Sequence, residues 1–79
     1  MFSRRYYYIT KLGERAYLDD VLFRGNARDF RVLDAVISHT LEDDIVEYTR
    51  SASGRSYPRG KILDSLAALE EMGYIVSYM

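Results

Sequence analysis

The stretch that decides the fold runs from Ile62 to Ile75 and reads ILDSLAALEEMGYI. Its apolar residues recur at helical spacing and make one continuous stripe: Ile62, Leu63, Leu66, Leu69 and Met72. Gly73 is a helix stop, because glycine accepts the left-handed conformation that ends many helices. The residues from Tyr74 to Tyr78 are mostly aromatic or β-branched and predict a strand. We therefore expect a helix over residues 57–72, capped by Ser56 or Tyr57 with Pro58 in its first turn, and a strand over 74–78.

Two more helices are predicted upstream of this stretch. The first spans residues 27–39, with an apolar stripe of Phe30, Leu33, Val36 and Ile37. The second spans residues 41–50, with Thr40 as its N-cap and with Leu41, Ile45 and Tyr48 facing inward. Its acidic residues indicate a solvated helix start and not a calcium site, since they lack the spacing of a calcium loop: Glu42, Asp43, Asp44 and Glu47. Residues 51–56 are expected to form a polar turn.

The N-terminal part of the chain predicts a strand followed by a helix. Aromatic and β-branched residues favour a strand from Phe2 to Thr10. Thr10 is the expected N-cap of a helix over residues 14–24, which Gly25 and Asn26 would close. The large apolar residues of this helix spread over more than one face: Tyr17, Val21, Leu22 and Phe23. We expect this surplus of apolar surface to form a homodimer interface.

The segment from Ala27 to Tyr78 resembles the winged-helix family. Its order of two helices, a turn, a leucine-rich helix and a strand is that of the family, whose recognition helix ends in a pattern similar to L-E-x-x-G-Y-I. The stretch from Tyr6 to Leu18 resembles the second wing strand and following helix (Y-x-L-T-x-x-G) of archaeal and bacterial winged-helix regulators. In those regulators it follows the recognition helix, whereas here it comes first. A circular permutation would explain this order.

The resemblance implies an α+β, mostly helical winged helix-turn-helix fold, with four helices in one domain over residues 1–79. A two-stranded antiparallel wing would form from residues 2–9 and 74–78. These two strands could pair within one chain or between the two chains of a homodimer, and the sequence leaves both arrangements open.

Composition excludes several classes of function. The chain has no cysteine, so it has no disulfide or thiolate metal site. Its apolar runs are too short to span a bilayer and its start lacks the apolar stretch of a signal peptide, so we expect a cytoplasmic protein that does not bind membranes. The family resemblance implies in addition that the protein is nucleoid-associated. No serine or histidine belongs to a recognisable catalytic constellation, so we expect no enzymatic activity, metal or cofactor.

Charge is segregated along the chain although the net charge is only −1. Residues 1–11 and 48–63 contain basic residues and no acidic ones, whereas residues 12–47 and 64–79 are net acidic. The resemblance implies that the helix over residues 57–72 enters the major groove of double-stranded DNA. The candidate DNA-binding residues are Arg4, Arg5, Arg50, Ser53, Arg55, Ser56, Tyr57, Arg59, Lys61 and Ser65.

The main alternative is that the domain is a protein–protein interaction module of a larger assembly. Its working surface would then be the tyrosine-rich strand and the helix over residues 14–24. A net charge of −1 suits this alternative better than it suits DNA binding.

Overall fold

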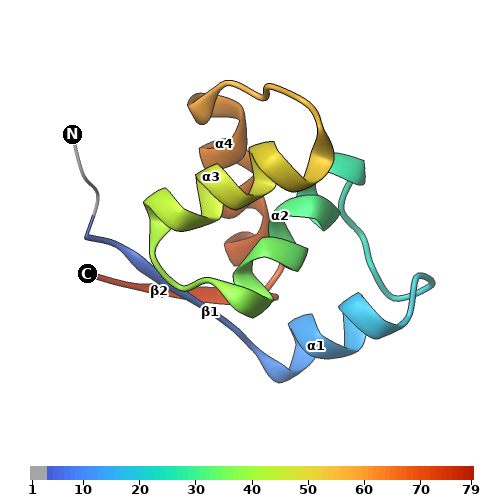
Figure 1. The fold of residues 1–79 in the computed structure, drawn as a ribbon. Helices are drawn as coiled ribbons and strands as arrows, with labels where there is room; N and C mark the ends of the chain where they lie inside the picture. Colours follow the sequence, from blue (N-terminus) through green and yellow to red (C-terminus); the bar gives the residue numbers. More distant parts are fainter. Residues whose placement is uncertain (1–3) are drawn as a thin grey trace.

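The computed structural model describes residues 4–79, which form a small α+β domain that is mostly helical (Figure 1). Two strands frame four helices along this part of the chain: β1 (Tyr6–Ile9), α1 (Lys11–Leu18), α2 (Ala27–Ser38), α3 (Glu42–Ser53), α4 (Arg59–Glu71) and β2 (Ile75–Tyr78). The first residues of the predicted strand, Phe2 and Ser3, lie outside the described residues. None of the helices between residues 4 and 79 is long and apolar enough to cross a membrane.

The core lies between α2, α3 and α4 and is closed on one side by the sheet. Each helix contributes its apolar stripe, and β1 and β2 add one inward-facing residue each: Val32, Leu33, Val36, Ile45, Val46, Ile62, Leu66 and Leu69 from the helices, and Tyr7 and Ile75 from the strands. The prediction for α4 is confirmed, since Ile62, Leu66 and Leu69 are fully buried. The stripe predicted for α2 is wrong at one residue, because Ile37 was expected to be buried and is exposed. Val32, which was not predicted to face inward, is buried, so the inner face of α2 is rotated relative to the prediction.

β1 and β2 pair antiparallel within the chain, with Tyr6 opposite Tyr78 and Ile9 opposite Ile75. The other edge of β1 is also bonded: the Tyr7 N–H donates to the Thr40 carbonyl (2.7 Å), and the Glu42 N–H donates to the Arg5 carbonyl (3.0 Å). An isolated antiparallel bridge joins Tyr6 to Leu41 at the same place. β1 is therefore the middle one of three extended segments. One neighbour is strand β2, and the other is the short segment of Thr40 and Leu41 that precedes α3.

Helix α1 is shorter than predicted. The Thr10 cap is confirmed, because its hydroxyl accepts a hydrogen bond from the Gly13 N–H (3.0 Å), but the helix ends at Leu18 and not at residue 24. Asn26 does not end α1 either; its side chain accepts from the Asp29 N–H (2.8 Å) while Asp29 accepts from the Asn26 N–H (3.1 Å). This reciprocal capping box begins α2, and it explains why the chain is not helical between the two helices.

The turn between α3 and α4 also differs from its prediction. Thr40 is not the N-cap of α3; Leu41 occupies that position and makes no side-chain cap bond. α3 continues to Ser53 and ends at Gly54, whose φ of 65° is left-handed backbone that glycine adopts without strain. α4 begins at Arg59, because Pro58 is the N-cap with extended backbone (ψ 147°), so neither Ser56 nor Tyr57 caps the helix.

Candidate nucleic-acid interface

A chain of side-chain bonds ties the first turn of α4 to the first turn of α3 and to β1. One Arg59 Nη donates to Asp43 Oδ1 (2.6 Å) and to Glu42 Oε1 (3.1 Å). The other Glu42 oxygen, Oε2, accepts from the Tyr7 hydroxyl (3.0 Å). Tyr7 and Glu42 are both buried, at 3% and 8% exposure. We call Tyr7, Glu42, Asp43 and Arg59 the Glu42 network.

Burial and hydrogen bonding shift the pKa values of two groups in this network. Burial first, and then the hydrogen bond to Glu42 and its charge, raise the pKa of Tyr7 to about 12, although the nearby Arg5 guanidinium opposes the rise. The bond to Asp43 raises the pKa of Arg59. At neutral pH the Tyr7 phenol is therefore a neutral donor and Arg59 is a cation between two carboxylates.

The structure corrects the sequence interpretation of the acidic cluster. Glu42 and Asp43 were expected to lie on a solvated helix start, but Glu42 is buried and both carboxylates bind Arg59. Their partners are 16, 17 and 35 residues away in the sequence, so neither helical periodicity nor local spacing indicates these pairs. Only the packing of β1 against the start of α3 brings the groups together.

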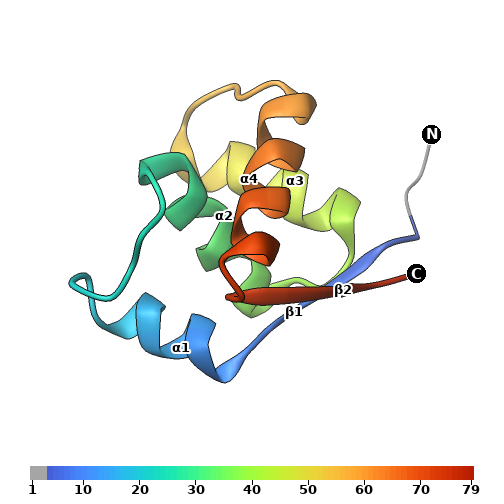
Figure 2. The same ribbon diagram turned by 180° about the vertical axis from the view of Figure 1, so that it is seen from behind.

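Four of the predicted DNA-binding residues have exposed side chains at the start of α4 or at the start of β1: Arg4, Arg55, Ser56 and Lys61. Arg5 is exposed as well, with one Nη 3.6 Å from the Met79 sulfur. Both views show the start of α4 and the turn before it at the top of the molecule, the outer ends of the two strands at one lateral edge, and α1 at the bottom (Figures 1 and 2). Both basic segments of the sequence thus lie away from α1.

Three other predicted residues build the turn between α3 and α4. The Arg50 Nε donates to the Tyr57 carbonyl (2.8 Å), which spans the turn. The Ser53 hydroxyl accepts from the Arg55 N–H (3.1 Å). Tyr57 is half-buried and packs against the core. These contacts fix the shape of the segment that displays Arg55 and Ser56.

Ser65 was wrongly predicted as a DNA contact. Its side chain is 0% exposed and its hydroxyl accepts from the Arg28 Nε (2.8 Å), so it faces α2 and not the solvent. The helical period explains the error, since Ser65 lies between Ile62 and Leu69 on the inner side of α4. Arg28, which the sequence interpretation did not single out, is the residue that satisfies it.

The exposed surface of α4 changes sign along its length. Lys61 is exposed in the first turn, whereas the exposed charges that follow are acidic: Asp64, Glu70 and Glu71. A polyanion would therefore be attracted to the beginning of α4 and repelled by its second half. This pattern limits the surface that the helix can offer to DNA to the turn and the first helical turn.

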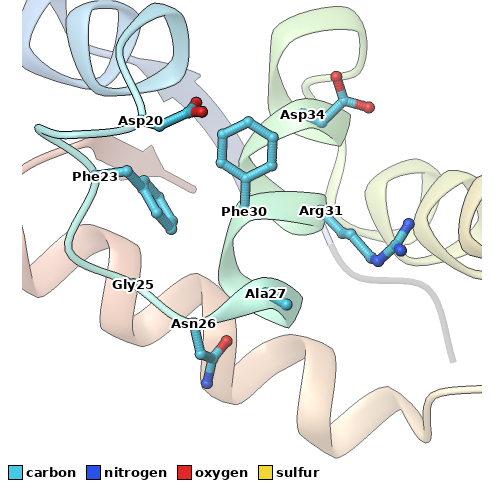
Figure 3. A pocket seen from close by; sticks show the side chains of 8 residues that line it. All are labelled: Asp20, Phe23, Gly25, Asn26, Ala27, Phe30, Arg31 and Asp34. Carbon is cyan, nitrogen blue, oxygen red and sulfur yellow. The ribbon is translucent and has the colours of Figure 1, made fainter.

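A separate hollow lies between α2 and the segment from Asp19 to Asn26, with a volume of about 620 Å³. Phe23 and Phe30 line it side by side, together with Asp20 and Asp34 (Figure 3). The two rings are 5.2 Å apart edge to face, while Tyr17 stacks on Phe30 at 5.4 Å. These ring contacts pack α1 and the segment that follows it against α2. No group of three potential metal ligands occurs within residues 4–79.

The same region carries aliphatic side chains that face the solvent. Leu18 and Val21 are 82% and 90% exposed, and Leu12 and Leu22 are about half exposed. The prediction of surplus apolar surface in this part of the chain is thereby supported for Val21 and Leu22, whereas Tyr17 and Phe23 are partly buried against the core.

Comparisons with protein-family models, curated proteins and solved structures gave no match to this chain.

Proposed function

We propose that the protein is a winged helix-turn-helix domain that binds double-stranded DNA through the turn before α4 and the first turn of α4. The observation that carries the proposal is the three-segment arrangement of Leu41, β1 and β2 beside α2, α3 and α4, with exposed cations at the start of α4. In this interpretation α4 is the recognition helix and β1 and β2 are the wing strands, joined in permuted order.

Electrostatics defines where the duplex would lie. Arg55 and Lys61 would contact phosphates, and the exposed Ser56 hydroxyl is a further donor. Arg4 and Arg5 at the start of β1 would also reach the backbone. Because the second half of α4 is acidic, the helix would approach the groove with its N-terminal end. Fold alone does not establish a function, so the charge pattern is the essential support.

The experiment measures binding of a fluorescein-labelled mixed-sequence duplex at several salt concentrations. Each phosphate contact contributes about 0.9 to the slope of log K against log salt, so replacing Arg55 and Lys61 by alanine should reduce that slope by about 2. The matched control replaces Arg15 and Arg31, which are exposed on α1 and α2, and removes the same charge. Absence of binding by the wild-type domain at low salt, or equal slopes for the two double variants, would overturn the proposal.

We also propose that two copies associate through the exposed aliphatic residues near α1: Leu12, Leu18, Val21 and Leu22. Charges of both signs surround these residues, so the surface can pair with itself around a two-fold axis. Light scattering should show that Leu18→Glu dissociates a dimer, whereas Ile37→Glu, which places the same charge on an exposed residue of α2, does not. A wild-type protein that stays monomeric would contradict this part of the proposal.

The same aliphatic surface favours a second candidate function, a protein–protein interaction module. In that case the wild-type domain would not bind the duplex at low salt, and Leu18→Glu would abolish capture of a protein partner. DNA binding that survives Leu18→Glu would favour the first candidate.

A further inference from the structure

We infer that Arg59 is a positioning residue: through Glu42 and Tyr7 it links the wing strand β1 to the first turn of α4, so that Lys61 and the two arginines that precede β1, Arg4 and Arg5, meet DNA together. This inference rests on the proposed function and assigns a different role to a residue that the sequence placed among the candidate DNA-binding residues. It makes two statements that can be tested. Loss of the Tyr7 hydroxyl should disturb α4, and loss of the Arg59 charge should leave the number of phosphate contacts unchanged.

The geometry of Glu42 couples three elements through one carboxylate. Its Oε2 accepts from Tyr7 of β1 (3.0 Å) and its Oε1 accepts from Arg59 of α4 (3.1 Å), while its own N–H donates to the Arg5 carbonyl (3.0 Å). A carboxylate that is only 8% exposed needs its partners, because an unpaired buried charge is strongly destabilising. Movement of β1 away from α3 therefore weakens the site that holds Arg59, and movement of Arg59 weakens the bond to β1.

The same geometry argues against a direct contact between Arg59 and a phosphate. The guanidinium lies between two carboxylates, at 2.6 Å from Asp43 and 3.1 Å from Glu42. The three groups together carry one negative charge, so a phosphate approaching Arg59 would meet net repulsion. Lys61, two residues further along α4, is exposed and takes no part in these two ion pairs, so it is the better phosphate ligand.

A pair of isosteric tyrosine variants tests the coupling. Tyr7→Phe and Tyr8→Phe each remove one hydroxyl from β1 and leave the charge unchanged, but Tyr7 is buried on Glu42 whereas Tyr8 is exposed on the opposite side of the strand. We expect Tyr7→Phe to weaken duplex binding about five-fold, the equivalent of a net hydrogen bond of ~1 kcal/mol, and Tyr8→Phe to change it less than two-fold. The amide NMR signals of Gly60 and Lys61 should shift in Tyr7→Phe and not in Tyr8→Phe, and circular dichroism checks that both variants are folded.

Arg59→Gln separates positioning from contact. A positioning residue predicts weaker binding with an unchanged salt slope, and it predicts that Tyr7→Phe adds little further loss when combined with Arg59→Gln. A phosphate contact predicts that the slope falls by about 1 and that the two losses add. The second result overturns the inference.

The outcomes distinguish this inference from the proposed function. If the wild-type domain binds DNA and Tyr7→Phe behaves like Tyr8→Phe in affinity and in NMR, the positioning role is wrong and the proposed function stands. If the wild-type domain does not bind the duplex at low salt, the proposed function itself fails and the DNA role of Arg59 fails with it.

Discussion

The starts of α3 and α4 are rich in charged residues, whereas the segment between α1 and α2 carries several large apolar ones, and in neither region does burial follow residue type. At the starts of α3 and α4, the Glu42 carboxylate is buried and accepts hydrogen bonds from Tyr7 and Arg59, and Asp43 pairs with Arg59. At the second, Tyr17, Phe23 and Phe30 fasten the chain to α2 while Leu18 and Val21 remain in the solvent. Residue type alone therefore does not decide whether a side chain at the end of a helix is buried. A side chain is buried there when a neighbouring segment supplies a hydrogen-bond, ionic or aromatic partner for it.

The largest expected difference between the two regions concerns burial of leucine. Leu66 of α4 is fully buried, so Leu66→Ala should lower the free energy of unfolding by about 3 kcal/mol through lost transfer energy and an unfilled cavity. Leu18→Ala, at 82% exposure, should change it by less than about 0.5 kcal/mol in the monomer. Urea unfolding of both variants at the same low protein concentration measures this contrast, and similar losses would show that the Leu18 end is packed in solution.

The Glu42 network should give the domain a characteristic alkaline instability. Because the pKa of Tyr7 is raised from 10.0 to about 12, its neutral form is favoured in the folded state, and the resulting stabilisation is complete below pH 10. It should be lost as the pH rises from 10 to about 12, at a cost of about 2 to 3 kcal/mol. Urea unfolding at both pH values measures the loss. The control, Tyr7→Phe, should lack this part of the pH dependence, and an unchanged dependence would contradict the assignment.

Glycine has opposite roles in the two regions. A Cβ at Gly13 of α1 would overlap the Tyr74 carbonyl oxygen and would lie 2.8 Å from Ile9 Cγ1, so Gly13→Ala should destabilise the fold by about 2 kcal/mol. Gly60 of α4 has no atom within 4 Å of such a Cβ, so Gly60→Ala should stabilise the fold by up to about 1 kcal/mol through its helix propensity. Thermal unfolding tests the signs, and a stable Gly13→Ala protein would show that α1 is held less closely to β2 than described.

The smallest expected effect on stability concerns two residues in front of helices: Asn26 before α2 and Thr40 before α3. Asn26 caps α2 in a reciprocal box with Asp29, so Asn26→Ala should lower the free energy of unfolding by about 1 kcal/mol. Thr40 was predicted to cap α3 but has no capping role, so Thr40→Ala should be nearly neutral. Calorimetry compares the free energy of unfolding of the two variants. A larger loss for Thr40→Ala than for Asn26→Ala would show that Thr40 does cap α3, as the sequence predicts.

The helices of the core could be predicted from the sequence because each buries one regular stripe. The pattern of Ile62, Leu66 and Leu69 gave α4 its type, its inner face and its approximate end. The bounds of α1 could not be predicted in the same way, since Val21, Leu22 and Phe23 continue its apolar pattern past the end of the helix at Leu18. Phe23 can pack against Phe30 from a loop as well as from a helix. The spacing of the apolar residues therefore does not show whether residues 19–24 are helical.

The candidate site was predictable only in its exposed part. Arg55 and Lys61 follow from a local run without acidic residues, and the structure leaves both exposed. Arg59 belongs to the same run, but its ion pairs with Glu42 and Asp43 depend on how α4 crosses the start of α3. Ser65 illustrates the same limit, because a small polar residue fits an inner helix face when Arg28 reaches it.

The helical core, the two terminal strands and the separation of charge along the chain follow from local sequence patterns, since each depends on residues close together in sequence. The place of β1 between Leu41 and β2, the burial of Glu42 and the exposure of individual cations follow instead from how the elements pack. These features join residues that are 35 positions apart, as Tyr7 and Glu42 are, or that lie at opposite ends of the chain, as Tyr6 and Tyr78 do. Their partners are chosen by the packing of whole elements and not by local conformational preference.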